Sequence, residues 1–137
     1  MLIALTAGLV LLVGVTAAID LRRLATPTGV ALNWTEATVF GICDRYLGNS
    51  VAGAEDPRPR AELCQHLHEA TADNRTHSAQ IGLRVDRSHQ QGGRAQVTVL
   101  ITRTGRPEIR VALDLVRRDG HWKVVREPAL CSTVGCP

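Results

Sequence analysis

The sequence predicts an α+β domain in which two helices pack on a four-stranded antiparallel meander sheet, preceded by a transmembrane helix. The first sign is residues 2–19, which carry no charged side chain. Two stretches of helical periodicity follow, and from residue 79 onward apolar and polar residues alternate. Helices and strands with one apolar side must bury it against each other, so this order predicts a two-layer domain. We place the anchor at 1–22, the α+β domain at 26–128 and a Cys-containing tail at 129–137.

Residues 2–19 have the composition of a membrane-spanning helix, since a bilayer core needs about 20 apolar residues and accepts about 17. We favour an uncleaved anchor over a signal peptide because no Lys or Arg precedes the run. The small residues at 16–18 keep a cleavage site open as the alternative. Arg22 and Arg23 follow the run and favour a cytoplasmic domain by the positive-inside rule. The cysteines favour the opposite side, and we expect an extracytoplasmic domain at the cell membrane, held by a single span.

The first predicted helix runs from Thr26-Pro27 to about Leu47. Thr is a good N-cap, and Pro is favoured at the first helical position. The stripe of this helix comprises Ala31, Trp34, Thr38, Ile42 and Tyr46. A second helix is expected from about Pro59 to Asn74, with Leu63 and Leu67 on its apolar face.

Four strands are expected after the helices, at about 79–85, at 95–101 and in a closing hairpin. Asp119-Gly120 suits a two-residue type I′ turn, which needs positive φ at both central positions. That turn pairs Leu115 with Val124 and Arg117 with Trp122. The apolar face of the hairpin then comprises Ile109, Val111, Leu113, Leu115, Trp122 and Val124. The residues expected to define the core are Trp34, Tyr46, Leu113, Leu115, Trp122 and Val124.

Four cysteines allow three pairings. We prefer Cys43–Cys64 with Cys131–Cys136, because the first two border the apolar stripes of the helices and the last two bracket a short loop. A Cys43–Cys131 bridge and four reduced thiols in a cytoplasmic domain are the alternatives.

The pattern Cys64-x-His66-x-His68 resembles a metal motif, but His66 points away from the other two on a helix. Two ligands are too few for a structural zinc site, so we expect no metal. The net charge of +3 comes from scattered basic residues, which gives no nucleic-acid signature. No cofactor motif and no catalytic set is visible.

A Thr-Pro-opened helix with Trp34 and Tyr46, followed by a meander that ends in Asp-Gly-His-Trp-Lys-Val-Val, resembles the nuclear transport factor two-like (NTF2-like, cystatin-like cone) superfamily. It is most similar to small bacterial envelope members with one N-terminal anchor. Mammalian-cell-entry-associated membrane proteins and bitopic subunits of conjugation or type IV secretion machines are examples. The resemblance implies an accessory or binding domain, a scaffold subunit of an envelope transport or secretion complex, with the membrane and a protein as partners.

The alternative implied by the same superfamily is a pocket enzyme or a carrier of a small apolar ligand. Such enzymes place an Asp or His with a Tyr or a second acid between helix and sheet. Asp44 and Tyr46 are two positions apart and cannot share a helix face, so no catalytic residue is assigned. A void with convergent polar groups would favour the enzyme, and a filled core would favour partner binding.

Overall fold

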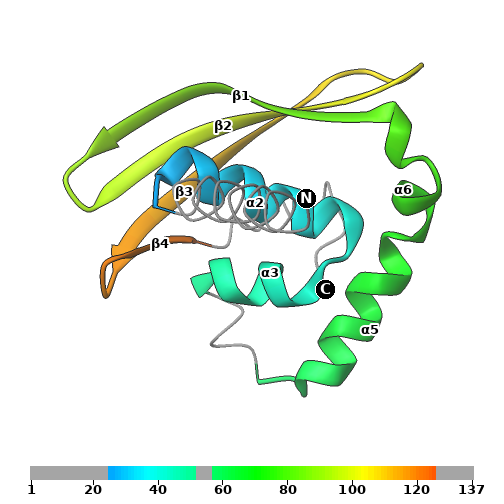
Figure 1. Cartoon of the computed structure of the whole chain (residues 1–137), viewed down its shortest axis with the longest axis horizontal. Coiled ribbons are helices and arrows are strands. Elements are labelled where there is room, and N and C mark those ends of the chain that lie inside the picture. The colour runs from blue at the N-terminus through cyan, green and yellow to red at the C-terminus, as the bar shows by residue number, and fades with distance from the viewer. Residues whose placement is uncertain (1–24, 52–56, 126–137) are drawn as a thin grey trace, which may run out of the picture.

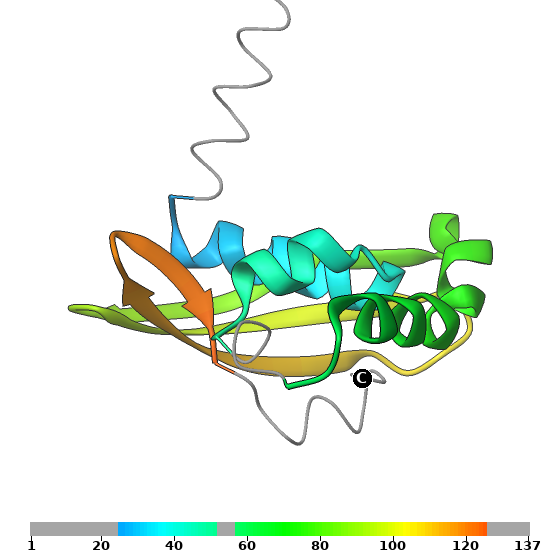
Figure 2. The same cartoon turned by 90° about the horizontal axis from the view of Figure 1, so that it is seen from below.

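The computed structural model describes residues 25–51 and 57–125. Its helices lie on one face of a four-stranded sheet of order β1-β2-β3-β4, with every neighbouring pair antiparallel (Figure 1, Figure 2). The α+β meander predicted from the sequence is therefore present. The elements are α2 (Pro27–Phe40), α3 (Cys43–Asn49), α5 (Arg60–Ala70), α6 (Ala72–Thr76), a 3₁₀ turn η1 (Ser78–Gln80), β1 (Ile81–Gln91), β2 (Arg94–Arg103), β3 (Ile109–Arg118) and β4 (His121–Val124).

The closing hairpin has the predicted register. Asp119 and Gly120 both have positive φ, at 51° and 81°, as a type I′ turn requires. Leu115 pairs with Val124 and Arg117 pairs with Trp122. The turn chemistry therefore places Trp122 on the side of the sheet that faces the helices.

The predicted first helix is two helices, because Gly41 ends α2. Its φ of 72° and ψ of 36° are left-handed, and its N–H donates to the carbonyl of Ala37. Glycine accepts this C-cap conformation without the steric cost that a Cβ brings. α3 then begins at Cys43 in a new direction.

The predicted second helix is also divided, and it begins at Arg60 and ends at Ala70. Thr71 follows with φ −107° and ψ 9°, and its buried hydroxyl donates to the carbonyl of Leu67 at 2.7 Å. A side chain that bonds to the backbone in this way competes with regular helix. The remaining turn is α6.

β1 begins and ends later than predicted. Residues 78–80 form the 3₁₀ turn, and pairing with β2 continues to Gln91 opposite Arg94. A bulge between Val85 and Arg87 shifts the register. Beyond the bulge the strand is exposed on both faces, so its polar residues no longer alternate with apolar ones.

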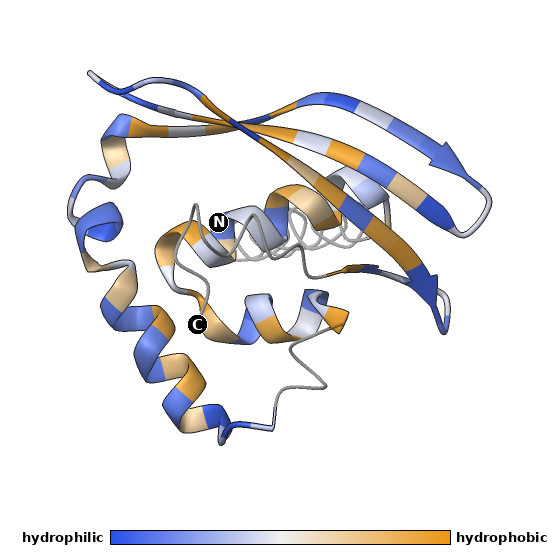
Figure 3. Ribbon diagram, turned by 180° about the vertical axis from the view of Figure 1, so that it is seen from behind, coloured by the Kyte–Doolittle hydropathy of each residue, from blue (hydrophilic) through white to orange (hydrophobic). Residues whose placement is uncertain are grey.

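The core lies between α2 and the sheet, and α2 contacts all four strands. Apolar residues recur along the strands beneath it (Figure 3). Six residues expected in the core are at most 4% exposed: Trp34, Tyr46, Leu113, Leu115, Trp122 and Val124. Ile109 is an exception to the predicted face, because it is the first residue of β3 and 37% exposed.

Within the described residues, no helix combines the length and the apolar character that crossing a bilayer requires. The stretch that carries the anchor prediction, residues 2–19, lies outside the described residues, as do Cys131 and Cys136. The predicted boundaries of the anchor and the tail are therefore not tested by the fold.

Candidate functional site

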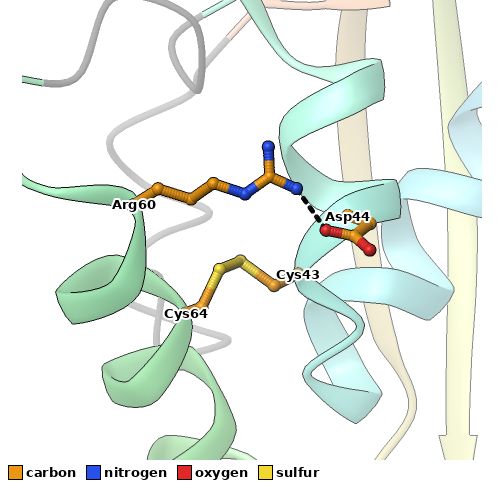
Figure 4. Close-up of a disulfide and its surroundings, with 4 residues drawn as sticks. All are labelled: Cys43, Asp44, Arg60 and Cys64. Carbon is orange, nitrogen blue, oxygen red and sulfur yellow. Dashed lines mark hydrogen bonds and ion pairs between the residues drawn. A yellow bond between two sulfur atoms is a disulfide. The ribbon is translucent and has the colours of Figure 1, made fainter.

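A disulfide joins the N-terminus of α3 to α5. Cys43 and Cys64 are bonded with their Cα atoms 5.3 Å apart and 21 positions apart in sequence (Figure 4). Beside the bridge, Arg60 of α5 donates a hydrogen bond to the carboxylate of Asp44 in α3, so this ion pair links the same two helices. Asp44 and Arg60 have side chains 85% and 67% exposed, so this ion pair contributes little beside the covalent link.

The bridge decides how Cys43 is paired, which the sequence left open. The preferred pairing of Cys43 with Cys64 is present, and the alternative Cys43–Cys131 bridge is therefore excluded in this structure. The sulfur of Cys64 is bonded to Cys43, so it is not available as the thiolate ligand of the Cys64-x-His66-x-His68 pattern. Among residues 25–51 and 57–125, no three His, Cys, Asp or Glu side chains gather as metal ligands do.

Arg75 of α6 connects the C-terminal ends of α2 and α5. Its guanidinium donates to the carbonyl of His68 at 2.7 Å, to the Thr71 hydroxyl at 2.6 Å and to the Phe40 carbonyl at 3.3 Å. Carbonyls in the last turn of a helix lack a partner within the helix, and a cation near a helix C-terminus is favourable. The sequence alone did not identify Arg75 as a helix cap.

An open groove of about 1000 Å³ runs along the outer side of α2, between α3 and β1. Its described lining comprises Thr26, Thr28, Gly29, Leu32, Asn33, Glu36, Arg45, Gly48, Asn49, Leu83 and Val85. The ionisable groups in this lining are Glu36 and Arg45, which pair at 3.3 Å and are about half exposed. Glu36 and Arg45 are thus engaged with each other and with solvent.

The two residues considered as a catalytic pair lie in different environments. Tyr46 is 3% exposed and packs its ring against that of Trp34, with centroids 5.8 Å apart. Asp44 lies on the surface with Arg60. The indole N–H of Trp34 is buried without a hydrogen-bond partner among the described residues, and the groove lining does not include Trp34.

A surface cluster on α6 and β2 shifts the pKa of a carboxyl group. Arg103 lies 2.9 Å from one oxygen of Asp73, and His77 Nδ1 lies 3.1 Å from the other. The hydrogen bond from Arg103 lowers the pKa of the Asp73 carboxyl, and the charges of Arg103, His77 and Arg106 add to the effect. The residues are far apart in sequence, so periodicity gave no signal for this cluster.

Comparison with known proteins gives the fold class. No family model matches the sequence, and no curated protein matches it. The crystal structure of a candidate NTF2-like transpeptidase from Campylobacter jejuni is similar, with a TM-score of 0.56 and 15% identity, over 74% of this chain and 99% of that one. A SEC-C motif-containing protein from Rhodopseudomonas palustris has a TM-score of 0.44 and 20% identity, over 75% of this chain and 77% of that one.

The first of these similarities agrees with the order and packing of the elements described above. Helices precede an antiparallel meander, and they cover one face of it. The chain therefore has an NTF2-like fold.

Proposed function

We propose that this protein is a membrane-anchored, extracytoplasmic accessory domain that binds a protein partner. In this proposal it is a scaffold subunit of an envelope transport or secretion complex. The observation that carries the proposal is the Cys43–Cys64 disulfide. Disulfides persist in oxidising compartments and are rare in the cytosol, so the bridge favours export of the domain.

The packing of the core adds support for a binding function over catalysis. The side chains between α2 and the sheet are 0–7% exposed, so the concave face of the sheet is filled by the protein itself. In an NTF2-like fold this face is where a pocket would lie. The transpeptidase activity named for the Campylobacter jejuni protein is not part of the proposal, because 15% identity carries the fold only.

One observation favours the alternative of a small apolar ligand carrier. Leu32, Leu83 and Val85 contribute apolar surface to the groove along α2. A carrier should bind a hydrophobic dye such as 1-anilinonaphthalene-8-sulfonate in the native state. Replacing Leu83 with Arg should then abolish dye binding, whereas Leu83→Arg has no effect on dye fluorescence if the groove is not a ligand site.

Sidedness is tested with reporters fused after Pro137 in a bacterial host. Alkaline phosphatase should be active there, because it needs an oxidising compartment. The matched control is the same fusion without residues 2–19, which should be inactive and should leave the membrane fraction. Activity confined to a cytoplasmic reporter would overturn the proposed export.

Thiol chemistry gives an independent test in the same cells. Cells are quenched with acid and the denatured protein is alkylated without reductant. Peptides that contain Cys43 and Cys64 should appear joined and unlabelled by mass spectrometry. Free labelling of both would mean that the bridge does not form in the cell.

Partner binding is tested by purification of the full chain in mild detergent after in-cell cross-linking. A scaffold subunit should yield the same cross-linked envelope protein from repeated preparations. The variant without residues 2–19 serves as the control for contacts that form only after lysis.

A further inference from the structure

The charge of the domain is divided between its two layers. Residues 81–125 hold nine Lys or Arg and four Asp or Glu, whereas the described residues before them hold four basic and five acidic side chains. The sheet half thus carries an excess of five positive charges, and the helix half is close to neutral. A search of the sequence for basic runs misses this division, because the arginines are separated by other residues.

The pairing of the strands brings five of these arginines to one face. Residues that pair across a ladder share a face, and Val99, Leu113 and Leu115 occupy the face that meets the helices. The other face carries the alternate positions. We define the arginine face as Arg84, Arg87, Arg94, Arg110 and Arg118, all exposed.

Among the described residues, the arginine face exposes no large apolar side chain. Leu100 pairs with Arg84 on one side and with Arg110 on the other, and it is 0% exposed. On β3, Ala112 is a diagonal neighbour of Leu100, whereas Val116 pairs with Arg94 further along the sheet. A strand rises about 3.3 Å per residue, so Arg84, Arg87 and Arg94 lie along about 20 Å of this face.

Three of these arginines have no bonding partner within the described part of the domain. Arg84, Arg87 and Arg94 make no hydrogen bond or ion pair within residues 25–51 and 57–125. Arg110 pairs with Glu108 at 3.3 Å. Guanidinium groups that stand unpaired on one face offer planar, bidentate sites for carboxylates.

We propose that the arginine face binds an acidic segment of a protein partner. This inference rests on the proposed function and gives the partner its chemistry. An anionic bilayer is the competing occupant, but Asp114 stands on the same face, held by Gln96 Nε2 at 3.2 Å. A headgroup layer repels that carboxylate, whereas a protein partner can offer it a hydrogen-bond donor.

The test uses the full chain in mild detergent and a fluorescein-labelled poly-Glu peptide as the probe. Fluorescence anisotropy should show binding that weakens as salt rises, since exposed charges are screened beyond about 10 Å at 0.1 M. The variant R84E/R87E should bind roughly tenfold more weakly, because each reversal replaces an attraction with a repulsion of similar size.

The matched control is R106E/R117E. It makes the same change in net charge within the same half of the chain, but Arg106 lies in a turn and Arg117 pairs with Trp122 on the other face. The control should keep most of the affinity for poly-Glu. An equal loss in both variants would mean that net charge alone attracts the probe, and it would overturn the inference.

Two further probes separate other occupants. Phosphatidylglycerol vesicles or oligothymidylate that bind more tightly than poly-Glu, and lose this binding in R84E/R87E, would overturn the acidic-protein assignment. Failure of poly-Glu to bind, with alkaline phosphatase still active after Pro137, would refute the arginine face and leave the proposed export standing. Poly-Glu binding with only a cytoplasmic reporter active would refute the export and leave the face.

Discussion

Replacing Gly41 with Ala should destabilise the domain more than the same change at another left-handed glycine. Gly41 has φ +72°, and a Cβ there would lie 2.3 Å from the Thr71 hydroxyl and 3.2 Å from the Leu67 carbonyl. The left-handed conformation costs an L-residue about 1–2 kcal/mol. Overpacking adds about 1–3 kcal/mol, because Thr71 is wholly buried and cannot move aside. We therefore expect a loss of about 2–4 kcal/mol after the smaller unfolded chain entropy of Ala is counted.

Gly92→Ala is the matched control for this prediction. Gly92 has φ +58°, and a Cβ at this position would meet no neighbouring atom within 4 Å, so it reports the conformational cost alone. Urea unfolding followed by the fluorescence of Trp34 and Trp122, both buried, gives the two free energies. Equal losses at Gly41 and Gly92 would refute the close approach of α2 to α5.

A double-mutant cycle adds a second check on the same contact. Thr71→Ala removes the hydroxyl that a Cβ at Gly41 would meet, although it also loses the bond to the Leu67 carbonyl. The double variant should therefore be more stable than the sum of the two single losses, by at least about 0.5 kcal/mol. Strict additivity would place the steric conflict elsewhere.

Three other predictions follow from the described contacts. Changing both Cys43 and Cys64 to Ala should lower the unfolding free energy by about 3 kcal/mol in the chain-entropy model, and reductant should then have no further effect on this pair; a variant as stable as the oxidised protein would contradict this. Trp122→Ala should cost about 3–5 kcal/mol in denaturant unfolding, since Trp122 is 4% exposed, and a loss below about 1 kcal/mol would contradict the hairpin register. The pKa of Asp73, followed by carboxyl NMR, should lie below its ordinary value of 3.8 and rise in Arg103→Gln. Because the pKa of Asp73 is lowered in the folded protein, the stability contributed by its ionised carboxylate is present above the unfolded pKa and is lost as pH falls through the folded pKa. An unchanged pKa in Arg103→Gln would exclude Arg103 as the main cause.

The parts of the fold that follow local rules could be predicted from the sequence. Asp119-Gly120 fixes a turn type, the turn fixes the register, and the register places Trp122 inside. The break at Gly41 could not be predicted in the same way. Ile42 and Tyr46 continue the helical stripe across it, and a single Gly within a helical pattern is tolerated at about 1 kcal/mol. The decisive factor is the approach of Thr71, which lies between α5 and α6, and this is a tertiary contact.

The charged surfaces show the same limit. The sequence shows scattered arginines, and only strand pairing brings Arg84, Arg87 and Arg94 to one face. Leu100 gave a partial signal, because it interrupts the polar positions of β2 with an apolar one. The pairing of Cys43 with Cys64 could be predicted because both border apolar helix stripes, although the contact forms between α3 and α5 and not between two long helices.

The position of Trp34 connects the filled core to the proposed use of the outer surface. Its ring lies against Tyr46 in the space that the curved sheet encloses, and its indole N–H has no partner there among the described residues. A buried donor without a partner costs about 1–3 kcal/mol, a cost that the large apolar surface of the same ring offsets. Because Trp34 fills the concave face of the sheet, the surfaces available to a partner lie on the outside of the domain. These surfaces are the groove along α2 and the arginine face, and the arginine face carries the unpaired charge. Trp34→Phe removes the orphan donor but leaves a cavity where the larger ring stood, so the two effects oppose each other. The loss in urea unfolding should therefore stay well below the roughly 3–5 kcal/mol expected for Trp34→Ala, and a loss as large as that would contradict the offset.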